Sequence, residues 1–179
     1  MTEKDVHQVA GWNGQSGERW VAYQTRLDAM MAVFGQAAIE AAAPATGERV
    51  LDIGCGAGAS SLDLVARVGA GGHVLGVDIS EPLIGRARAL APQDAPVLFQ
   101  VADASSTALP EGAFDMLFSR FGVMFFDDPT AAFAHMRRAL RDRVAPSAGG
   151  CPASRPSASA PNRSRPCRAS RRKRPARPA

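Results

Sequence analysis

The chain has 179 residues, of which 46% are hydrophobic, and this is enough to build the core of one domain. It has no apolar run of the roughly 18 to 20 residues that cross a bilayer, and its first residues are polar, so we expect a cytoplasmic protein with no membrane segment. The three cysteines lack metal-ligand spacing, which argues against a zinc site and a disulfide framework.

Charge is distributed very unevenly along the chain. Residues 1–142 hold 11 of the 21 Lys and Arg and all 17 Asp and Glu, a net charge of −6. Residues 143–179 hold the other 10 Lys and Arg and no acid, a net charge of +10. The two stretches are therefore different kinds of chain.

Two helices are expected near the N-terminus, after a polar stretch over residues 1–15 that shows little periodicity. Apolar residues recur at helical spacing from Ser16 to Phe34, and Ser16 can cap that helix. An Ala-rich helix from Gln36 to Ala43 should end before Pro44. We interpret the aromatic residues of this region as packing residues: Trp12, Trp20 and Tyr23.

A strand, a glycine turn and a helix start follow one another over residues 49–61. The central sequence is Asp52-Ile53-Gly54-Cys55-Gly56-Ala57-Gly58, and an amphipathic helix from Ser60 to Val68 comes after it. Glycines accept positive φ and allow close approach of a ligand to backbone N–H groups at a helix end. Because Asp52 places a carboxylate at the mouth of the strand, we expect a nucleotide-like ligand with a cationic end.

Two further strands each end in an aspartate. Strand 73–77 leads to Asp78, and strand 97–101 leads to Asp103. Ligands of α/β sheets gather at the carboxyl ends of the strands, where one carboxylate can hold both hydroxyls of a ribose. Between these strands a helix is expected over Pro82 to Ala91, with Leu83, Ile84, Ala87 and Leu90 facing inward.

A fourth strand and a last helix complete the regular pattern. The strand is expected over Phe114 to Ser119, and the helix over Thr130 to Arg141, capped by Asp128 and Pro129. The expected inward face of this helix is Ala131, Phe133, Ala134, Met136 and Leu140.

These motifs resemble those of class I S-adenosylmethionine-dependent methyltransferases. The glycine motif over residues 52–58 matches the first motif of that family, and Leu109-Pro110-Glu111-Gly112 before Phe114-Asp115 matches the segment that introduces its fourth strand. The resemblance implies an α/β fold with a Rossmann-like parallel sheet in the order 3-2-1-4, helices on both faces and N-terminal cap helices. It also implies methyl transfer from S-adenosyl-L-methionine to a small-molecule acceptor whose identity, and whose methylated atom, the sequence leaves open.

The resemblance also implies a set of cofactor-binding residues, in which Asp103 and Ala104 hold the adenine. The family commonly has a cysteine at the position of Cys55 without using it chemically, although a helix end would lower the pKa of a thiol there. We assign no catalytic residue, because His73 and His135 are expected to be structural and His7 lies in a flexible segment. The expected cofactor-binding residues are Asp52, Gly54, Cys55, Gly56, Gly58, Asp78, Ile79, Asp103, Ala104 and Ser119.

Two alternatives compete with this interpretation. The spacing Gly54-x-Gly56-x-x-Ala59 also satisfies a loose dinucleotide-binding fingerprint, so an NAD(P)-binding oxidoreductase stays open, although such enzymes do not routinely require Asp103. A non-catalytic, basic-tailed binding protein is the other alternative. Residues 143–179 have no aromatic side chain for base stacking, so we expect no specific nucleic-acid partner.

The pattern divides the chain into three parts: cap helices over residues 1–45, a cofactor-binding half-domain over 46–141, and a disordered basic tail over 142–179. The resembled family continues after about residue 141 with an Arg-Pro-Gly-Gly turn and an apolar fifth strand, which this chain lacks. We interpret this as a truncation or frameshift, which leaves open whether the chain turns over. It would also make Phe114 to Ser119 an exposed apolar edge.

Overall fold

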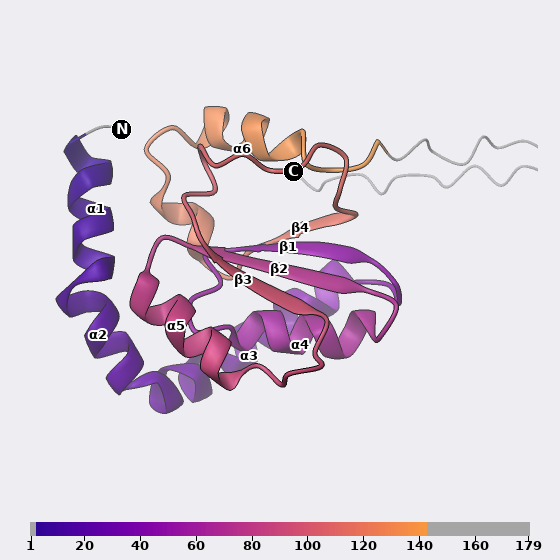
Figure 1. Cartoon of the computed structure of the whole chain (residues 1–179), viewed down its shortest axis with the longest axis horizontal. Helices are drawn as coiled ribbons and strands as arrows, with labels where there is room; N and C mark the ends of the chain where they lie inside the picture. The colour runs from indigo at the N-terminus through magenta and orange to yellow at the C-terminus, as the bar shows by residue number, and fades with distance from the viewer. Residues whose placement is uncertain (1–2, 143–179) are drawn as a thin grey trace, which may run out of the picture. The chain divides into compact units, whose positions relative to one another are not determined.

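The computed structural model describes residues 3–142 as a parallel four-stranded sheet with helices on both faces (Figure 1). The strands are β1 (Arg49–Ile53), β2 (His73–Asp78), β3 (Val97–Val101) and β4 (Met116–Phe118). They pair in parallel in the order β3-β2-β1-β4, which confirms the expected order. The tail expected over residues 142–179 lies, from residue 143 on, outside the described residues.

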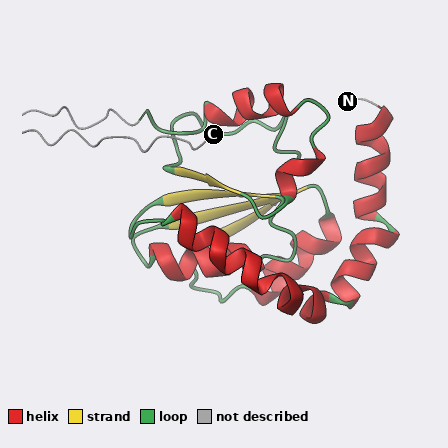
Figure 2. Cartoon of the chain, turned by 180° about the vertical axis from the view of Figure 1, so that it is seen from behind, coloured by secondary structure: helices red, strands yellow, loops and turns green. Residues whose placement is uncertain are grey.

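Seven helical segments surround this sheet in the described residues. Helices α3 (Gln24–Ala42), α4 (Ala59–Val68) and α5 (Glu81–Leu90) lie on one face, and α6 (Pro129–Arg137) lies on the other, as the two opposite views agree (Figures 1 and 2). Helices α1 (Glu3–Asn13) and α2 (Gln15–Ala22) stand beside one end of the sheet, and a short 3-10 helix, η1 (Gly122–Phe125), precedes α6. No described helix is long and apolar enough to cross a membrane.

The central strand β1 forms the core with both of its faces. Its residues from Val50 to Ile53 are all buried. On one face Leu51 and Ile53 pack with Met136 of α6, and on the other Val50 packs with helix α4. A strand that is buried on both faces needs a continuous apolar run, which is the pattern of parallel sheets. Asp52 is the exception in this run, because it is a carboxylate that is buried as completely as its apolar neighbours.

The N-terminal helices differ from the sequence prediction. Residues 3–13 form α1 although their sequence shows little periodicity, and the break between α2 and α3 falls at Tyr23. A single helix α3 continues through Gly35, where the prediction ended one helix and began another. A Cβ at Gly35 would lie 3.3 Å from Nη1 of Arg120, so this glycine makes room for a side chain and does not end the helix.

Helix α6 is shorter and rotated compared with the prediction. It ends at Arg137, because the next residues run beside Phe114: Phe114 N donates to Ala139 O at 3.0 Å, and Arg141 N donates to Phe114 O at 2.8 Å. The buried residues here are Ala132, Met136 and Ala139, and Phe133 instead packs edge-on against Phe126 at 47% exposure. The predicted inward positions Ala131, Phe133 and Ala134 are exposed, Leu140 is only half-buried, and Leu90 at the end of α5 is exposed too.

Strand β4 is the last strand of the sheet in the described part of the chain, as expected. It covers only residues 116–118, because Phe114 pairs with Leu140 in an isolated parallel bridge and Ser119 turns toward β1. Its side chains are not the exposed apolar edge that we predicted: Phe118 is buried, and Met116 and Leu117 are half-buried.

Candidate functional site

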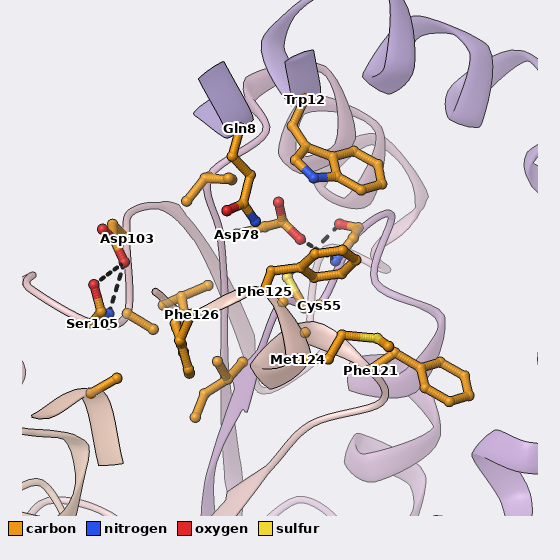
Figure 3. A pocket seen from close by; sticks show the side chains of 18 of the residues that line it. Gln8, Trp12, Cys55, Asp78, Asp103, Ser105, Phe121, Met124, Phe125 and Phe126 are labelled. Carbon is orange, nitrogen blue, oxygen red and sulfur yellow. Dashed lines mark hydrogen bonds between the residues drawn. The ribbon is translucent and has the colours of Figure 1, made fainter. Parts of the chain in front are cut away.

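A cavity of about 650 Å³ lies at the carboxyl ends of β1 and β2 (Figure 3). One part of its wall comes from the glycine loop after β1, the end of β2 and the loop after β3. Another part comes from α1, α2, α3 and the segment 120–126. We call these parts the glycine-loop side and the aromatic side. Among the described residues, four carboxylates line the cavity: Asp78, Asp103, Asp127 and Asp128.

The three glycines of the loop have different roles. A Cβ on Gly54 (φ +66°) would lie 2.5 Å from Cα of Gly122, so here two backbone segments touch. A Cβ on Gly58 (φ +86°) would lie 2.9 Å from the ring of Phe99. Only Gly56 (φ +57°) has no atom within 4 Å of such a Cβ, and it lines the cavity. Close approach of a ligand therefore explains one glycine of the three.

Asp52 is fully buried and does not line the cavity, so it is not at the mouth of the strand as predicted. Its Oδ2 accepts hydrogen bonds from Ser60 Oγ at 2.8 Å and Ser61 Oγ at 2.7 Å, which fixes the first turn of α4 behind the glycine loop. Its Oδ1 has no hydrogen-bond partner among the described residues. Burial raises the pKa of this carboxyl to about 6, although the two serine hydroxyls oppose the shift.

Asp78 connects the glycine loop to the start of α5. Its Oδ2 accepts from Gly56 N at 2.9 Å, and its Oδ1 accepts from Ser80 N at 2.9 Å. Burial raises the pKa of Asp78, and the backbone N–H groups of Ser80 and Gly56 counteract the rise. The carboxylate lines the cavity, where Gln8 and Trp12 of α1 extend toward it in Figure 3.

The other predicted residues are divided between the wall and its support. Asp103 and Ala104 line the cavity with Ile79, and Oδ1 of Asp103 accepts from Ser105 N at 2.8 Å and from Ser105 Oγ at 2.7 Å. Ser119 does not line it: its Oγ donates to Ile53 O at 2.8 Å and accepts from Val123 N, which connects β1 to η1. Gly58 also stays outside the wall.

Cys55 lines the cavity but is buried, and burial raises the pKa of its thiol well above the usual value. The lowering that we expected from the helix end is therefore wrong. None of the three histidines lines the cavity, and Nε2 of His135 forms a hydrogen bond with Thr107 O at 2.7 Å.

Sequence reasoning missed Asn13, which fastens α1 to the loop between β2 and α5. Its Nδ2 donates to Ile79 O at 2.9 Å, and its Oδ1 accepts from Glu81 N at 2.8 Å at the start of α5. Ser80 Oγ donates to Trp12 O at 2.7 Å beside it. The neighbouring glycines mark a turn here, but no local signal indicates partners 66 to 68 residues away.

Sequence reasoning also missed Arg120, the only Lys or Arg among the described residues that line the cavity. Its side chain is 15% exposed, packs against Gly35 of α3, and has Nη2 3.9 Å from Oδ1 of Asp28. Nothing in the local sequence distinguishes this arginine from its surface neighbours.

Comparisons with known proteins decide the family. A family model described as "Methyltransferase domain" matches residues 50–143, which is more than half of the chain. The chain belongs to this family. The expected class I methyltransferase fold is therefore confirmed, and neither the oxidoreductase nor the basic-tailed binding protein finds support.

Individual relatives agree with this assignment. Aklanonic acid methyltransferase DauC of Streptomyces sp. (strain C5) is 36% identical over 102 residues, 56% of this chain and 46% of that protein. Nocamycin O-methyltransferase of Saccharothrix syringae is 36% identical over 100 residues, 55% of this chain and 36% of that protein. This methyltransferase chain thus covers less than half of the length of these relatives.

Two solved structures support the fold. An S-adenosylmethionine-dependent methyltransferase from Mesorhizobium loti has a TM-score of 0.53 at 30% identity, covering 59% of this chain and 48% of that one. Phosphoethanolamine N-methyltransferase 2 of Haemonchus contortus, in complex with S-adenosyl-L-methionine, has a TM-score of 0.55 at 32% identity, covering 60% and 25%.

Proposed function

We propose that this methyltransferase domain binds S-adenosyl-L-methionine and transfers its methyl group to a small-molecule acceptor. The observation that carries the proposal is the pair of backbone N–H groups that hold Asp78 at the cavity wall, next to the bare backbone of Gly56. Each oxygen of Asp78 accepts one of these hydrogen bonds and keeps a further lone pair. Such a carboxylate is prepared to accept the two hydroxyls of a ribose.

The neighbouring groups fit the remainder of the cofactor. Oδ2 of Asp103 and the backbone of Ala104 suit the adenine, and Ile79 gives an apolar contact next to them. Gly54 and Cys55 continue the wall toward the methionine end. Asp52, Gly58 and Ser119 act from behind the wall by fixing the loop, α4 and η1.

The charges that line the cavity suit a zwitterion with a sulfonium group. Four carboxylates face one arginine among the described lining residues, so the field favours a cation. Arg120 is the group that suits the α-carboxylate of the methionine moiety.

Methyl transfer needs little acid or base catalysis from the protein. The sulfonium is an activated leaving group when the cofactor is bound, so the residues have to hold the acceptor in line with the methyl group and exclude water. The aromatic side of the cavity supplies that water-excluding wall. No histidine is among the described residues that line the cavity, so we assign no general base.

Thermal unfolding of the full chain with increasing S-adenosylhomocysteine tests this proposal, with NAD as the control ligand. A ligand that binds only the folded state adds about 2.7 kcal/mol of stability at about 100 times its Kd. We expect the midpoint to rise with S-adenosylhomocysteine and to stay constant with NAD. A midpoint that responds to neither ligand, or equally to both, contradicts the proposal.

A further inference from the structure

Large apolar side chains are exposed on helix α3 and on the segment 120–126, both of which belong to the aromatic side. Met30, Val33 and Phe34 are 62%, 74% and 60% exposed, and we call these three residues the α3 ridge. Phe121, Met124 and Phe125 line the cavity and are also exposed, and we call them the platform. Single exposed apolar residues are ordinary, whereas a contiguous patch beside a site marks a binding surface.

The ridge and the platform are continuous. Residues 30, 33 and 34 share one face of α3, because they are spaced by three and four positions. The ring of Phe34 lies 6.3 Å from that of Phe121, at an angle of 66°. Met31 on the same helix lines the cavity. An apolar path therefore leads from the cavity over Phe121 to the outside of α3.

The backbone holds the platform in a strained conformation. Phe121 has φ +74°, in the left-handed region that bulky side chains rarely adopt. The next residue, Gly122, is packed against Gly54 of the glycine loop. The backbone at Phe121 is therefore strained while its ring lies at the cavity, and such strain is characteristic of functional segments.

Two possible occupants are unsuitable. Residues 143–179 of this chain do not suit the ridge, and a phosphorylated ligand does not suit the cavity. Residues 143–179 include no Leu, Ile, Met, Phe, Tyr or Trp, so they offer no large apolar side chain to cover the ridge. The four carboxylates of the cavity would repel a phosphate, and among the described lining residues Arg120 alone would attract it.

We propose that the methyl acceptor is an apolar aromatic molecule, whose reacting end lies in the cavity and whose remainder lies across the platform and the α3 ridge. This inference rests on the proposed methyl transfer. In that step a lone pair of the acceptor's heteroatom forms the bond to the methyl carbon, the carbon–sulfur bond breaks with its electron pair going to sulfur, and the acceptor's proton leaves to solvent.

Calorimetric titration of the full chain in two stages tests the inference. S-adenosylhomocysteine is titrated first, and the saturated protein is then titrated with 2-naphthol, which is uncharged at neutral pH, or with phosphoethanolamine. We expect 2-naphthol to bind and phosphoethanolamine to give no binding heat. In the double variant Val33→Ser/Phe34→Ser 2-naphthol should bind about tenfold more weakly or worse, because apolar burial is lost, whereas S-adenosylhomocysteine should bind as before.

The control variant is Leu98→Ser, which changes a residue of β3 that is 61% exposed and does not line the cavity. It should bind both ligands as the original chain does. Equal affinity for 2-naphthol in the original chain and the double variant, or binding of phosphoethanolamine, overturns the inference. A chain that is dimeric by light scattering and becomes monomeric in the double variant also overturns it, because the ridge then serves a second copy. Failure of the first titration refutes the proposed function itself, and the inference with it.

Discussion

The two sides of the cavity are built in different ways. The glycine-loop side consists of backbone N–H groups and carboxylates that follow strand ends, held by short hydrogen bonds such as Gly56 N to Asp78. The aromatic side consists of side chains from three helices and η1, whose rings meet edge-on, as Trp12 does with Trp20 at 5.7 Å and with Phe125 at 6.1 Å. The first side offers polar groups in fixed positions, whereas the second offers shape and apolar area.

The largest expected effect separates the three glycines. Gly54→Ala should lower the free energy of unfolding by about 2 to 5 kcal/mol, the sum of left-handed strain and a clash with the backbone of Gly122. Gly56→Ala is the matched control and should lose only the strain, about 1 to 2 kcal/mol, because nothing lies near its Cβ. Urea unfolding measures both, and equal losses would show that the Gly54–Gly122 contact is not tight.

The difference between the two sides of the cavity explains how far the sequence could predict the site. The strand order and the positions of Asp78 and Asp103 follow from local patterns, because parallel strands bring their carboxyl ends to one edge. Arg120 and Asn13 could not be predicted, since their roles depend on Gly35 and Glu81, which are distant in the chain. The inward face of α6 was also predicted wrongly: Phe133 packs edge-on against Phe126, and Phe114 pairs with the residues that follow the helix.

The next effect concerns pH and the carboxylate behind the glycine loop. Asp52 has a pKa of about 6 in the folded chain against 3.8 as its ordinary value, so the folded state binds the extra proton. Stability should therefore fall as pH rises from about 4 to about 6, by at most about 3 kcal/mol, and then stay level as far as this group is concerned.

Asp52→Asn removes this contribution and keeps an oxygen that can accept from Ser60 and Ser61. Urea unfolding of both proteins between pH 4 and pH 7 gives the test, because other titrating groups cancel in the difference between the two curves. A difference that does not change with pH would contradict the raised pKa of Asp52.

A smaller effect is expected for cofactor affinity at Asp78. Asp78→Asn should weaken binding of S-adenosylhomocysteine by about tenfold, because one charge-assisted acceptor is lost. Asp115→Asn is the matched control: Asp115 also accepts from a backbone N–H, that of Arg49 at 2.8 Å, but it does not line the cavity. Calorimetry measures both affinities, and equal weakening in the two variants would show that Asp78 does not contact the ligand.

The smallest effect concerns the fastening of α1. Asn13→Ala should increase hydrogen exchange of the α1 amides about fivefold, which corresponds to about 1 kcal/mol of local stability, and leave the sheet amides unchanged. Gln36→Ala removes one exposed hydrogen bond, to Asp63 at 3.0 Å, and should not alter α1. Exchange that stays as slow in the Asn13 variant as in the original chain would show that other contacts hold α1.

The central claim is that both sides form one cavity around one cofactor, and tryptophan fluorescence tests it most directly. The chain has two tryptophans, Trp12 and Trp20, and both line the aromatic side. We predict that S-adenosylhomocysteine changes their emission in a saturable way, that Asp78→Asn shifts the titration to higher concentration, and that NAD has no effect. Binding seen by calorimetry without any change in emission would show that the two sides do not share a ligand, and would contradict the account.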